Sequence, residues 1–515
     1  MNRYPLGIQT FEKIREENLF YVDKTDLIYN IVKGSQNNFL SRPRRFGKSL
    51  LVTTMQAYFE GKKDLFKGLA IEKLEKEWVK YPVIHIDLSS GKYYEVQRIM
   101  STLDFLLSRY ELKYDITPRD LSGFGDRFNN IIQTAAAQTG QKVVVLIDEY
   151  DAPMLDSNAK PELQEQIRSI MRDFFSPLKA NEGLLRFVFL TGITKFSQLS
   201  IFSELNNIKN YSLDDEYGAI CGFTQEEILS TFHEGIHEMA KANGLTIEQT
   251  VAKMKEQYDG YRFTPHCPNI YNPYSVLNAL HDKKFSNYWF ATGTPTFLLE
   301  LLIKNDIEMP QLEGIVATED QFDSPTDNIG NPIPVLYQSG YLTIKDYDEG
   351  IYTLGYPNEE VRMGLNRSML NYIAPQYGLK TTAFAAQFRA AMRKDDIDTA
   401  MKVLQSFLAA FPYDIHHNRE DYFQAILFTI FITLGFTIHA EVKTARGRID
   451  LLISTKTTIF VMELKIDQSA AKALEQIDAK DYTLPYKHDG RRIFKVGINF
   501  STEKRTVDEW RYEEA

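Results

Sequence analysis

Cysteine is almost absent from this sequence, whose 515 residues include only Cys221 and Cys267. Two thiols cannot build a disulfide framework or a four-thiolate zinc site, so we expect reduced cysteines in a cytoplasmic protein. The N-terminal segment lacks the apolar core of a signal peptide. The longest apolar stretch, residues 425–436, is interrupted by threonine and glycine and is too short to cross a bilayer, so it predicts a buried helix. The sequence therefore predicts a protein without a membrane partner.

An excess of positive charge is also lacking. The chain has 59 Lys and Arg residues against 69 Asp and Glu residues, a formal net charge of −10. This balance argues against a histone-like coat on nucleic acid, but it is compatible with a local basic groove because attraction depends on how charge is distributed. Hydrophobic residues make up 43% of the chain and aromatic residues 13%, which excludes disorder over most of it. The length predicts about three or four domains.

The first part of the chain alternates apolar runs with helical patterns. The runs are nearly continuous, as expected for strands covered on both faces. They occupy residues 38–41, 83–88, 143–147 and 187–190. This alternation predicts a parallel sheet flanked by helices. From about residue 224 helical periodicity dominates, a strand–turn–strand pattern follows at 341–354, and a compact α/β pattern ends the chain.

Residues 42–49 form a basic loop, RPRRFGKS, between the first predicted strand and a helical pattern. A phosphate-binding loop needs this placement because backbone N–H groups and the helix N-terminus cradle phosphates, a lysine reaches the β/γ oxygens and a hydroxyl holds Mg²⁺. Gly47, Lys48 and Ser49 supply the second half of that motif, and Arg42 stands where its first glycine is expected. The alternative for this loop alone is a basic turn on a solvated surface.

Two later strands end in polar residues that complete such a site. The run VVVLIDEYD ends in Asp148 and Glu149, at the strand end where ligands bind in parallel sheets. We expect Asp148 to hold the Mg²⁺ shell and Glu149 to position or activate a water. Thr191 ends the run FVFLT and is a candidate γ-phosphate sensor. The alternatives are an acidic helix cap and a plain strand-terminal turn. Loop, acidic pair and polar strand end follow the order that a P-loop NTPase requires.

The segments RPRRFGKSLLVTT, DEYDAP and LTGITKFS resemble the bacterial AAA-ATPase-like family, whose members often carry a C-terminal PD-(D/E)XK nuclease domain. The segments YDGYRF and YNPYSVLNAL look like the same family, so the resemblance extends over nearly the whole chain. It implies ATP and Mg²⁺ as cofactors, with Lys48, Ser49, Asp148 and Glu149 in the functional positions. No residue matches an arginine finger.

The C-terminal region carries two carboxylates and a lysine on adjacent predicted strands. Side chains alternate along a strand, so Glu463 and Lys465 share one face of VMELKI. A hairpin that turns symmetrically about Lys456 and Thr457 places Asp450 across from Glu463. Two carboxylates can bind Mg²⁺ for phosphodiester cleavage, and the lysine can orient or activate the attacking water. The alternative is an exposed hairpin face with a cross-strand ion pair.

This arrangement resembles the PD-(D/E)XK core, with these three side chains in the motif positions. The resemblance implies an assisting Gln and Tyr, for which Gln476 and Tyr482 are the candidates. Glu420 is a candidate extra metal ligand, with an acid at a helix start as the alternative. Nearby basic groups either contact phosphates or are scattered solvated charge. They are Lys443, Arg446, Arg448, Lys472, Arg491 and Arg492.

The combined prediction is an α/β protein with four parts. These are a P-loop AAA-ATPase-like domain with a parallel sheet (1–223), a helical lid region (224–330), a winged-helix-like hairpin with a helical connector (331–410) and a restriction-endonuclease-like α/β domain (411–515). We expect ATP binding and hydrolysis coupled to a Mg²⁺-dependent nuclease that acts on nucleic acid, DNA in preference to RNA, with homo-oligomer formation left open. The alternative is a nucleotide-dependent regulatory switch whose nuclease-like domain binds nucleic acid or protein without cleaving it.

Overall fold

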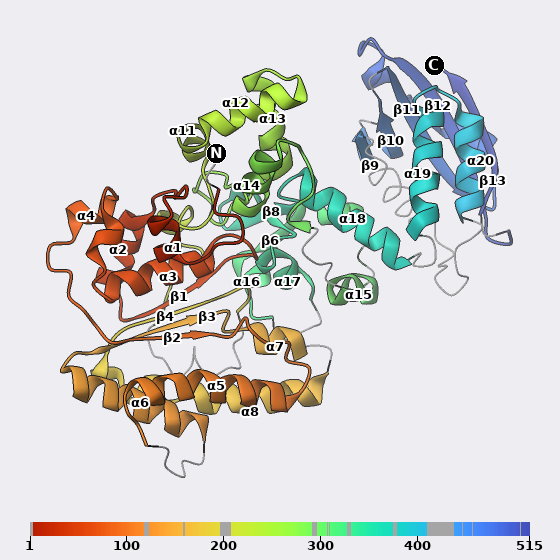
Figure 1. Cartoon of the computed structure of the whole chain (residues 1–515). Coiled ribbons are helices and arrows are strands. Elements are labelled where there is room, and N and C mark those ends of the chain that lie inside the picture. Colours follow the sequence, from red (N-terminus) through yellow and green to blue (C-terminus); the bar gives the residue numbers. More distant parts are fainter. Residues whose placement is uncertain are drawn as a thin grey trace. The chain divides into compact units, whose positions relative to one another are not determined.

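A computed structural model of the protein describes residues 4–117, 123–157, 160–195, 208–290, 296–305, 307, 309–326, 331–373, 378–408, 437–444, 446–455, 457–504 and 506–515 (Figure 1). The chain divides into two compact units. One comprises Met1–Thr292 and Gly314–Glu360, and the other comprises Gly293–Glu313 and Val361–Ala515. Within the described ranges, no helix combines the length and the apolar character needed to cross a bilayer.

A five-stranded sheet forms the centre of the first unit, in the order β2-β3-β4-β1-β5. Its strands are β1 (Asn37–Ser41), β2 (Val83–Asp87), β3 (Val143–Asp148), β4 (Leu185–Gly192) and β5 (Lys209–Asn210). Every neighbouring pair is parallel, and β3 is buried along its whole length. The predicted parallel sheet is therefore confirmed, and the short edge strand β5 is an addition that the apolar pattern did not indicate.

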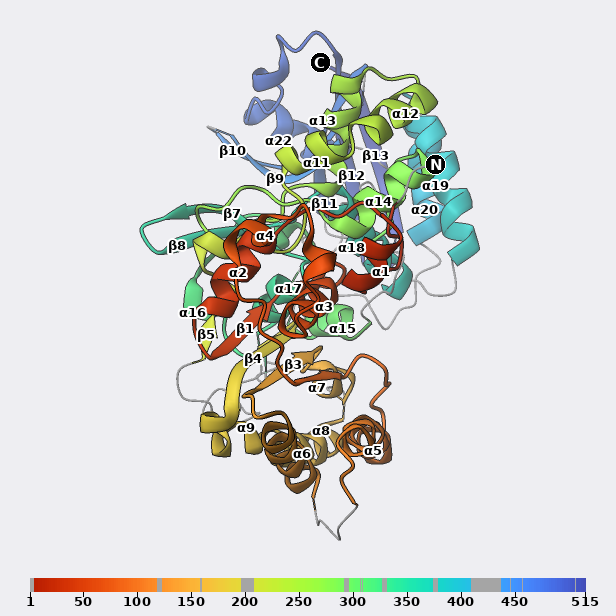
Figure 2. The ribbon, with the colours of Figure 1, turned by 60° about the vertical axis from the view of Figure 1, so that its left-hand side comes forward.

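Helices cover both faces of this sheet (Figures 1 and 2). One face carries α1 (Phe11–Glu16), α2 (Thr25–Lys33), α3 (Lys48–Phe59) and α4 (Ala70–Leu74). The other carries α5 (Val96–Lys113), α6 (Phe124–Thr139), α7 (Ala152–Ser157), α8 (Pro161–Phe175) and α9 (Pro177–Ala180). A continuous apolar core joins β2, β3 and β4 to α5, α6 and α8. The near-continuous apolar character of the strands follows from this coverage.

The helical region begins at residue 225, as the periodicity predicted. Its members are α11 (Gln225–Thr231), α12 (His233–Asn243), α13 (Ile247–Tyr258) and α14 (Pro273–Asp282). Capping boxes at Thr224 and Thr246 start α11 and α13, and the Asn272 side chain caps α14 ahead of Pro273. The helices pack around a shared apolar cluster that also includes Tyr4. Local capping signals thus decide where these helices start.

A small antiparallel sheet, in the order β6-β8-β7, completes the first unit. The strand β6 (Ile315–Thr318) is followed by α16 (Glu319–Phe322) and α17 (Ile333–Gln338), and then by the hairpin of β7 (Thr343–Asp348) and β8 (Ile351–Gly355). Glu349 and Gly350 make its turn with φ values of 43° and 92°. The hairpin confirms the strand–turn–strand pattern predicted at 341–354, whereas β6 was not predicted.

The second unit contains a five-stranded mixed sheet, in the order β13-β12-β11-β10-β9. Its strands are β9 (Thr437–Thr444), β10 (Gly447–Ser454), β11 (Thr458–Ile466), β12 (Arg492–Ser501) and β13 (Thr506–Glu514), and β11 and β12 are its parallel pair. Its helices are α15 (Thr296–Lys304), α18 (Glu359–Ile373), α19 (Gly378–Met392), α20 (Ile397–Leu408) and α22 (Ala470–Ala479), with the start of α18 in the first unit. The fold matches the restriction-endonuclease-like expectation. The buried helix predicted at residues 425–436 lies outside the described residues.

Glu360 is a buried carboxyl group in the first unit. It accepts hydrogen bonds from Ser275 Oγ and Trp289 N, each at 2.7 Å, and burial raises its pKa from 4.5 to about 7. Between these two values the unfolded chain releases a proton that the folded chain retains, so stability falls as the pH rises. We expect Glu360→Gln to remove this loss, which amounts to roughly 2–3 kcal/mol between pH 5 and pH 8.

Urea unfolding at the two pH values measures this difference. Glu256→Gln removes an exposed carboxylate on α13 and should retain the pH dependence of the wild type. Parallel pH dependence in Glu360→Gln and the wild type would show that Glu360 is ionised in the folded protein.

Candidate functional site

The basic loop lies between β1 and α3, at the edge where the parallel strands end. The strand stops at Ser41 and the helix starts at Lys48, with Gly47 as its N-cap. Gly47 has a φ of 95°, a left-handed conformation that glycine adopts without a steric penalty. The unpaired N–H groups of the first turn of α3 therefore open toward the carboxyl edge of the sheet, where an anion is favoured.

Lys48 is a buried cation that joins this loop to β3. Its Nζ donates to the carbonyl oxygens of Arg42 and Pro43 at 3.1 and 3.3 Å and lies 3.2 Å from Glu149 Oε1. The lysine side chain is 3% exposed, so these acceptors replace the water that a buried ammonium loses. Residues about one hundred positions apart in the sequence thus meet at one point.

Ser49 and Asp148 form the second contact between the loop and β3. Burial, followed by the charge of Glu149, raises the pKa of Asp148 to about 7, while a hydrogen bond with the Ser49 side chain opposes that rise. Asp148 is 2% exposed, and its Oδ1 has no hydrogen-bond partner in the part of the chain that the structure describes. A buried oxygen without a donor beside a hydroxyl suits a Mg²⁺ ion, which takes oxygen ligands from one or two side chains and from phosphates.

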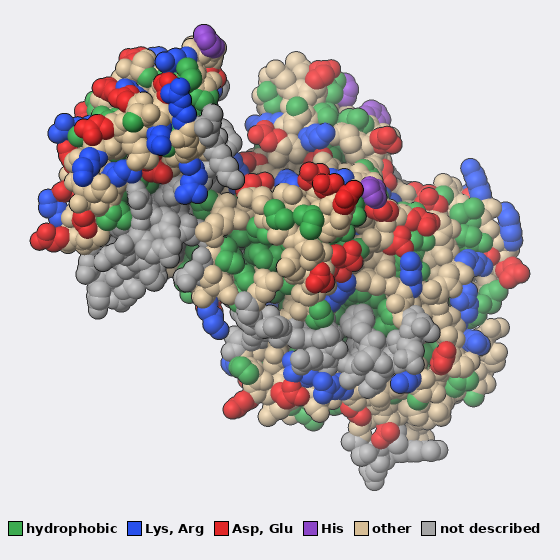
Figure 3. Space-filling view, turned by 180° about the vertical axis from the view of Figure 1, so that it is seen from behind, with side chains coloured by type: hydrophobic (Ala, Val, Ile, Leu, Met, Phe, Trp, Pro, Cys, Tyr) green, Lys and Arg blue, Asp and Glu red, His purple; other side chains and the backbone are tan. Residues whose placement is uncertain are grey.

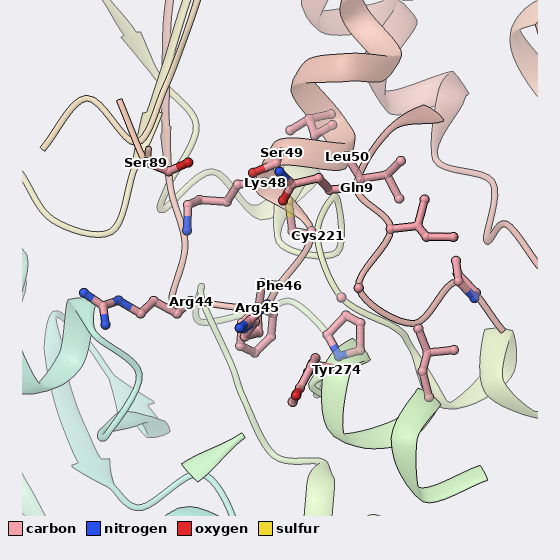
Figure 4. A pocket seen from close by; sticks show the side chains of 18 of the residues that line it. Gln9, Arg44, Arg45, Phe46, Lys48, Ser49, Leu50, Ser89, Cys221 and Tyr274 are labelled. Atoms are coloured by element: carbon pink, nitrogen blue, oxygen red, sulfur yellow. The ribbon is translucent and has the colours of Figure 1, made fainter. Parts of the chain in front are cut away.

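A pocket of about 440 Å³ opens over the loop (Figure 4). Its lining includes residues 5–9, residues 44–51, Glu149, residues 220–223 and the start of α14. Small-molecule sites usually enclose roughly 300–1,000 Å³. The pocket therefore has the size and the phosphate-binding floor that a nucleotide needs.

Thr191 lies inside the sheet, away from the lining of the pocket. Its Oγ1 donates to the carbonyl oxygen of Leu40 at 2.7 Å, and the residue is fully buried. The hydroxyl therefore links β4 to β1. Its sequence-based role as a γ-phosphate sensor remains a prediction, and this geometry favours the strand-terminal alternative.

Asp151 is a site residue that sequence reasoning passed over. Its Oδ2 accepts hydrogen bonds from the N–H groups of Ile193 and Thr194, at 2.9 and 2.7 Å, and from Thr194 Oγ1 at 2.9 Å. A Cβ on Gly192 would lie 2.3 Å from Asp151 Oδ1, so the close approach requires glycine. The third carboxylate in DEYDAP was the available signal. Through these hydrogen bonds, Asp151 holds the turn after β3 against the end of β4.

Arg42 occupies the place of the missing first glycine, and the structure shows what its side chain does. The guanidinium is buried, donates to the carbonyl oxygens of Ser41, Ser212 and Tyr217 at 2.9 to 3.0 Å, and lies 4.4 Å from the ring centroid of Phe263. The side chain therefore turns away from the phosphate side of the loop and fastens the loop to distant segments.

The second candidate site lies on β10 and β11, and the structure has the hairpin register that the sequence predicted. Leu451 pairs with Met462 and Leu452 with Val461, so Asp450 and Glu463 are the next pair in this register. Asp450 Oδ2 accepts a hydrogen bond from Leu464 N at 2.8 Å. The two carboxylates therefore lie on adjacent strands at the same level of the sheet.

Glu463 is the centre of this arrangement and is 1% exposed. Its Oε1 lies 3.2 Å from Lys465 Nζ and accepts a hydrogen bond from Gln476 Nε2, which α22 supplies. Lys465 also donates to the carbonyl oxygen of Leu464 at 2.9 Å. A buried carboxylate needs such partners because desolvation penalises its charge. The structure thus brings Gln476 together with Glu463 and Lys465.

Tyr482 braces the start of β10. Its hydroxyl accepts a hydrogen bond from Arg448 N at 3.2 Å, and a Cβ on Gly447 would lie 2.7 Å from the same oxygen. Gly447 therefore permits the close approach of the tyrosine. This contact holds the strand that carries Asp450.

At this second site the described residues provide two candidate metal ligands, the carboxylates of Asp450 and Glu463. No group of three or more His, Cys, Asp or Glu side chains with metal-binding geometry occurs among those residues. Mg²⁺ is often held by one or two carboxylates together with substrate phosphates, so Asp450 and Glu463 still fit such an ion. The candidate extra ligand Glu420 lies outside the described residues.

Three of the six basic residues named near this site are paired with acids. Arg446 pairs with Asp481, Arg491 with Asp489, and Arg492 with Glu514 and Asp395. Figure 3 shows acidic and basic side chains interspersed over the second unit. For these three arginines the structure favours scattered, paired charge over a phosphate-binding stripe.

Two family models match the chain. One, described as Predicted AAA-ATPase, covers residues 5–202, and one of the PD-(D/E)XK nuclease superfamily covers residues 418–510. A relative described as "Uncharacterized protein in vnfD 5'region", from Azotobacter chroococcum mcd 1, is 33% identical over 519 residues, which is 98% of each chain.

Two solved structures are similar to the chain at low sequence identity. Cdc6p from Pyrobaculum aerophilum is 10% identical over 69% of this chain and 93% of its own, with a TM-score of 0.23. The ORC2 protein from Aeropyrum pernix is 11% identical over 70% of this chain and 93% of its own, with a TM-score of 0.25. Scores at this level do not establish a shared fold.

Arg42→Gly restores the glycine of the usual phosphate loop and therefore tests the role of the arginine. We expect a loss of about 2–4 kcal/mol in unfolding free energy, because three carbonyl oxygens lose a buried charged donor. Arg45→Gly is the matched control: Arg45 is exposed and has a φ of 69°, so its loss should change stability by less than about 1 kcal/mol. Urea unfolding measures both, and equal stability of Arg42→Gly and the wild type would contradict this role.

Proposed function

This chain belongs to the predicted AAA-ATPase family and carries a C-terminal PD-(D/E)XK nuclease superfamily domain, and from this premise we propose that it binds and hydrolyses ATP and cleaves nucleic acid in a Mg²⁺-dependent reaction. The ATPase proposal rests on two contacts beside one pocket. Lys48 Nζ lies next to Glu149, and Ser49 contacts Asp148. The convergence of Glu463, Lys465 and Gln476 beside Asp450 supports the nuclease half.

In the ATPase half, Lys48 changes its partner when a nucleotide binds. Its Nζ leaves Glu149 and takes a phosphate oxygen, which is a stronger acceptor for a buried ammonium. Glu149 is then free to orient a water molecule toward the γ-phosphate. Bound Mg²⁺, held by Ser49 and Asp148, would neutralise charge on the β and γ oxygens.

In the nuclease half, Asp450 and Glu463 supply oxygen ligands from two adjacent strands. Lys465 lies beside Glu463 and can orient or activate the water that attacks the phosphodiester. Gln476 holds Glu463 Oε1 and so directs the other carboxylate oxygen. Bound Mg²⁺ would polarise the phosphate and lower the pKa of the attacking water. DNA is the first substrate to test.

Both cysteines are free and buried. This agrees with the reducing, cytoplasmic environment that we propose for the protein.

Lys48→Ala and Glu149→Gln separate nucleotide binding from hydrolysis. We expect Lys48→Ala to weaken ATP binding at least tenfold, because the phosphates lose their buried cation. Glu149→Gln should bind ATP as tightly as the wild type or more tightly, because Lys48 loses a competing carboxylate, yet its phosphate release should fall at least 100-fold. Fluorescent-nucleotide titration and phosphate release measure the two effects.

Lys160→Ala, at an exposed position, is the control for these two variants and should behave as the wild type does. Phosphate release by Glu149→Gln at the wild-type rate would remove Glu149 from the reaction.

Lys465→Ala tests the nuclease. We expect cleavage of plasmid or single-stranded DNA with Mg²⁺ to fall by about 10²-fold or more, because the attacking water loses its orienting group. Lys402→Ala removes an exposed lysine on α20 and should cleave normally. Equal cleavage by the wild type and Lys465→Ala would refute the role of Lys465. ATP binding by a wild type that cleaves neither DNA nor RNA with any divalent metal would favour the alternative, a regulatory switch.

A further inference from the structure

Arg44 differs from the neighbouring side chains of the phosphate loop in its contacts. Arg42 is hydrogen-bonded, Arg45 lies 4.8 Å from the ring centroid of Tyr274, and Phe46 contacts the ring of Tyr261. In the described parts of the chain, the exposed guanidinium of Arg44 has no hydrogen bond, ion pair or ring contact. The neighbouring side chains therefore anchor the loop, whereas the charge of Arg44 acts at a distance, where it opposes the rise in the pKa of the buried Tyr341.

The backbone beneath Arg44 is held in place. Trp289 Nε1 donates to the Arg44 carbonyl oxygen at 3.0 Å, and Trp289 is itself 5% exposed. On the preceding residue, the carbonyl oxygen of Pro43 accepts from Lys48, and the Pro43 ring lies against Gly340, where an added Cβ would meet it at 2.7 Å. The free arginine therefore extends from a rigid base, which reduces the entropy lost when it engages a ligand.

The side chain lies at the pocket that receives the phosphates. Arg44, Lys48 and Glu149 all line this pocket. In Figure 4 the Arg44 side chain extends from the loop away from the other labelled residues, whereas Arg45 lies beside Tyr274. Because the side chain is exposed and lines the pocket, a change of rotamer would bring Arg44 to a phosphoryl group bound to the loop.

We propose that Arg44 stabilises, in cis, the charge that develops on the γ-phosphate during hydrolysis. This inference rests on the proposed ATPase function. A guanidinium matches phosphate oxygens with two parallel N–H donors, and an arginine in this role raises kcat by about 10³–10⁵ in other phosphoryl-transfer enzymes. The resemblance to the AAA-ATPase-like family assigns no arginine finger, and a loop arginine would make the site independent of one supplied by a neighbouring molecule.

The reaction balances without any further reactant. The γ-phosphorus gains a bond to the water oxygen and loses its bond to the oxygen that bridges to ADP. One hydrogen of the water stays on the released phosphate and the other passes to solvent as a proton. Arg44 keeps its protons throughout, because it acts only through charge and hydrogen bonds.

Arg44→Ala and Arg44→Lys test the role. We expect kcat for phosphate release to fall about 10²–10³-fold in Arg44→Ala, with the dissociation constant for ADP within about threefold of the wild type. Arg44→Lys should recover only part of the rate, because an ammonium cannot form the two parallel bonds. Binding of ADP with aluminium fluoride, a mimic of the transferred group, should weaken together with kcat.

The control is Arg109→Ala, an exposed arginine on α5, which should keep the wild-type rate and affinities. A mixture of Arg44→Ala with Lys48→Ala tests the cis assignment, since the second variant retains Arg44 but lacks a working loop. We expect no recovery, and recovery of phosphate release would overturn action in cis. Equal kcat in Arg44→Ala and the wild type would overturn the inference alone. A wild type that releases no phosphate would overturn the proposed ATPase function and this inference with it.

Discussion

The ammonium of Lys48 is buried, and the loop of the first site is arranged around its need for acceptors. Two carbonyl oxygens come from the loop itself and one carboxylate oxygen comes from Glu149. A buried cation without such partners would cost several kcal/mol. The loop must therefore curl over the helix start, and β3 must end beside it. In the proposed reaction, a phosphate would replace Glu149 as the partner of Lys48.

Hydrogen bonds also connect the end of β4 with later segments of the first unit. Asp151 holds Thr194, and the next residue, Lys195, donates its N–H to Gln338 Oε1 at 2.9 Å and pairs with Asp323. Thr326 N donates to the carbonyl oxygen of Lys195 at 2.9 Å. The residues that follow β4 are thus bonded to Asp323, Thr326 and Gln338 of the same unit.

A buried charged group, the carboxylate of Glu463, also determines contacts in the second unit. VMELKI is an apolar strand with two charged residues, and Glu463 is almost completely enclosed. Its carboxylate is retained in the sheet because Lys465 and Gln476 partner one oxygen. Asp450 is held differently, by the N–H of Leu464 across the hairpin. The two carboxylates are therefore preorganised on rigid strands, which favours a precise metal or phosphate site over a flexible one.

The sequence by itself determined the features that arise from local patterns. Apolar runs and helical periodicity indicated four strands of the first sheet, the helices from residue 225 and the hairpin at 341–354, and the symmetry of the β10–β11 turn was enough to place Asp450 opposite Glu463. These predictions succeeded because strand alternation, capping and turn geometry involve neighbours in the chain. The strands β5, β6, β9 and β13 were missed, since short or edge strands acquire their identity from partners distant in sequence.

Only the tertiary structure decided how the side chains of the sites are used. Arg42 occupies a glycine position of the loop motif, yet its guanidinium turns inward to carbonyl oxygens at Ser212 and Tyr217. Thr191 ends a strand like a sensor residue, yet its hydroxyl bonds within the sheet. Asp151 had no assigned role until its contacts with β4 were visible. Sequence spacing specifies which residues can approach the site, but burial and long-range acceptors determine which way each side chain points, because the large majority of buried polar groups are hydrogen-bonded in a folded chain.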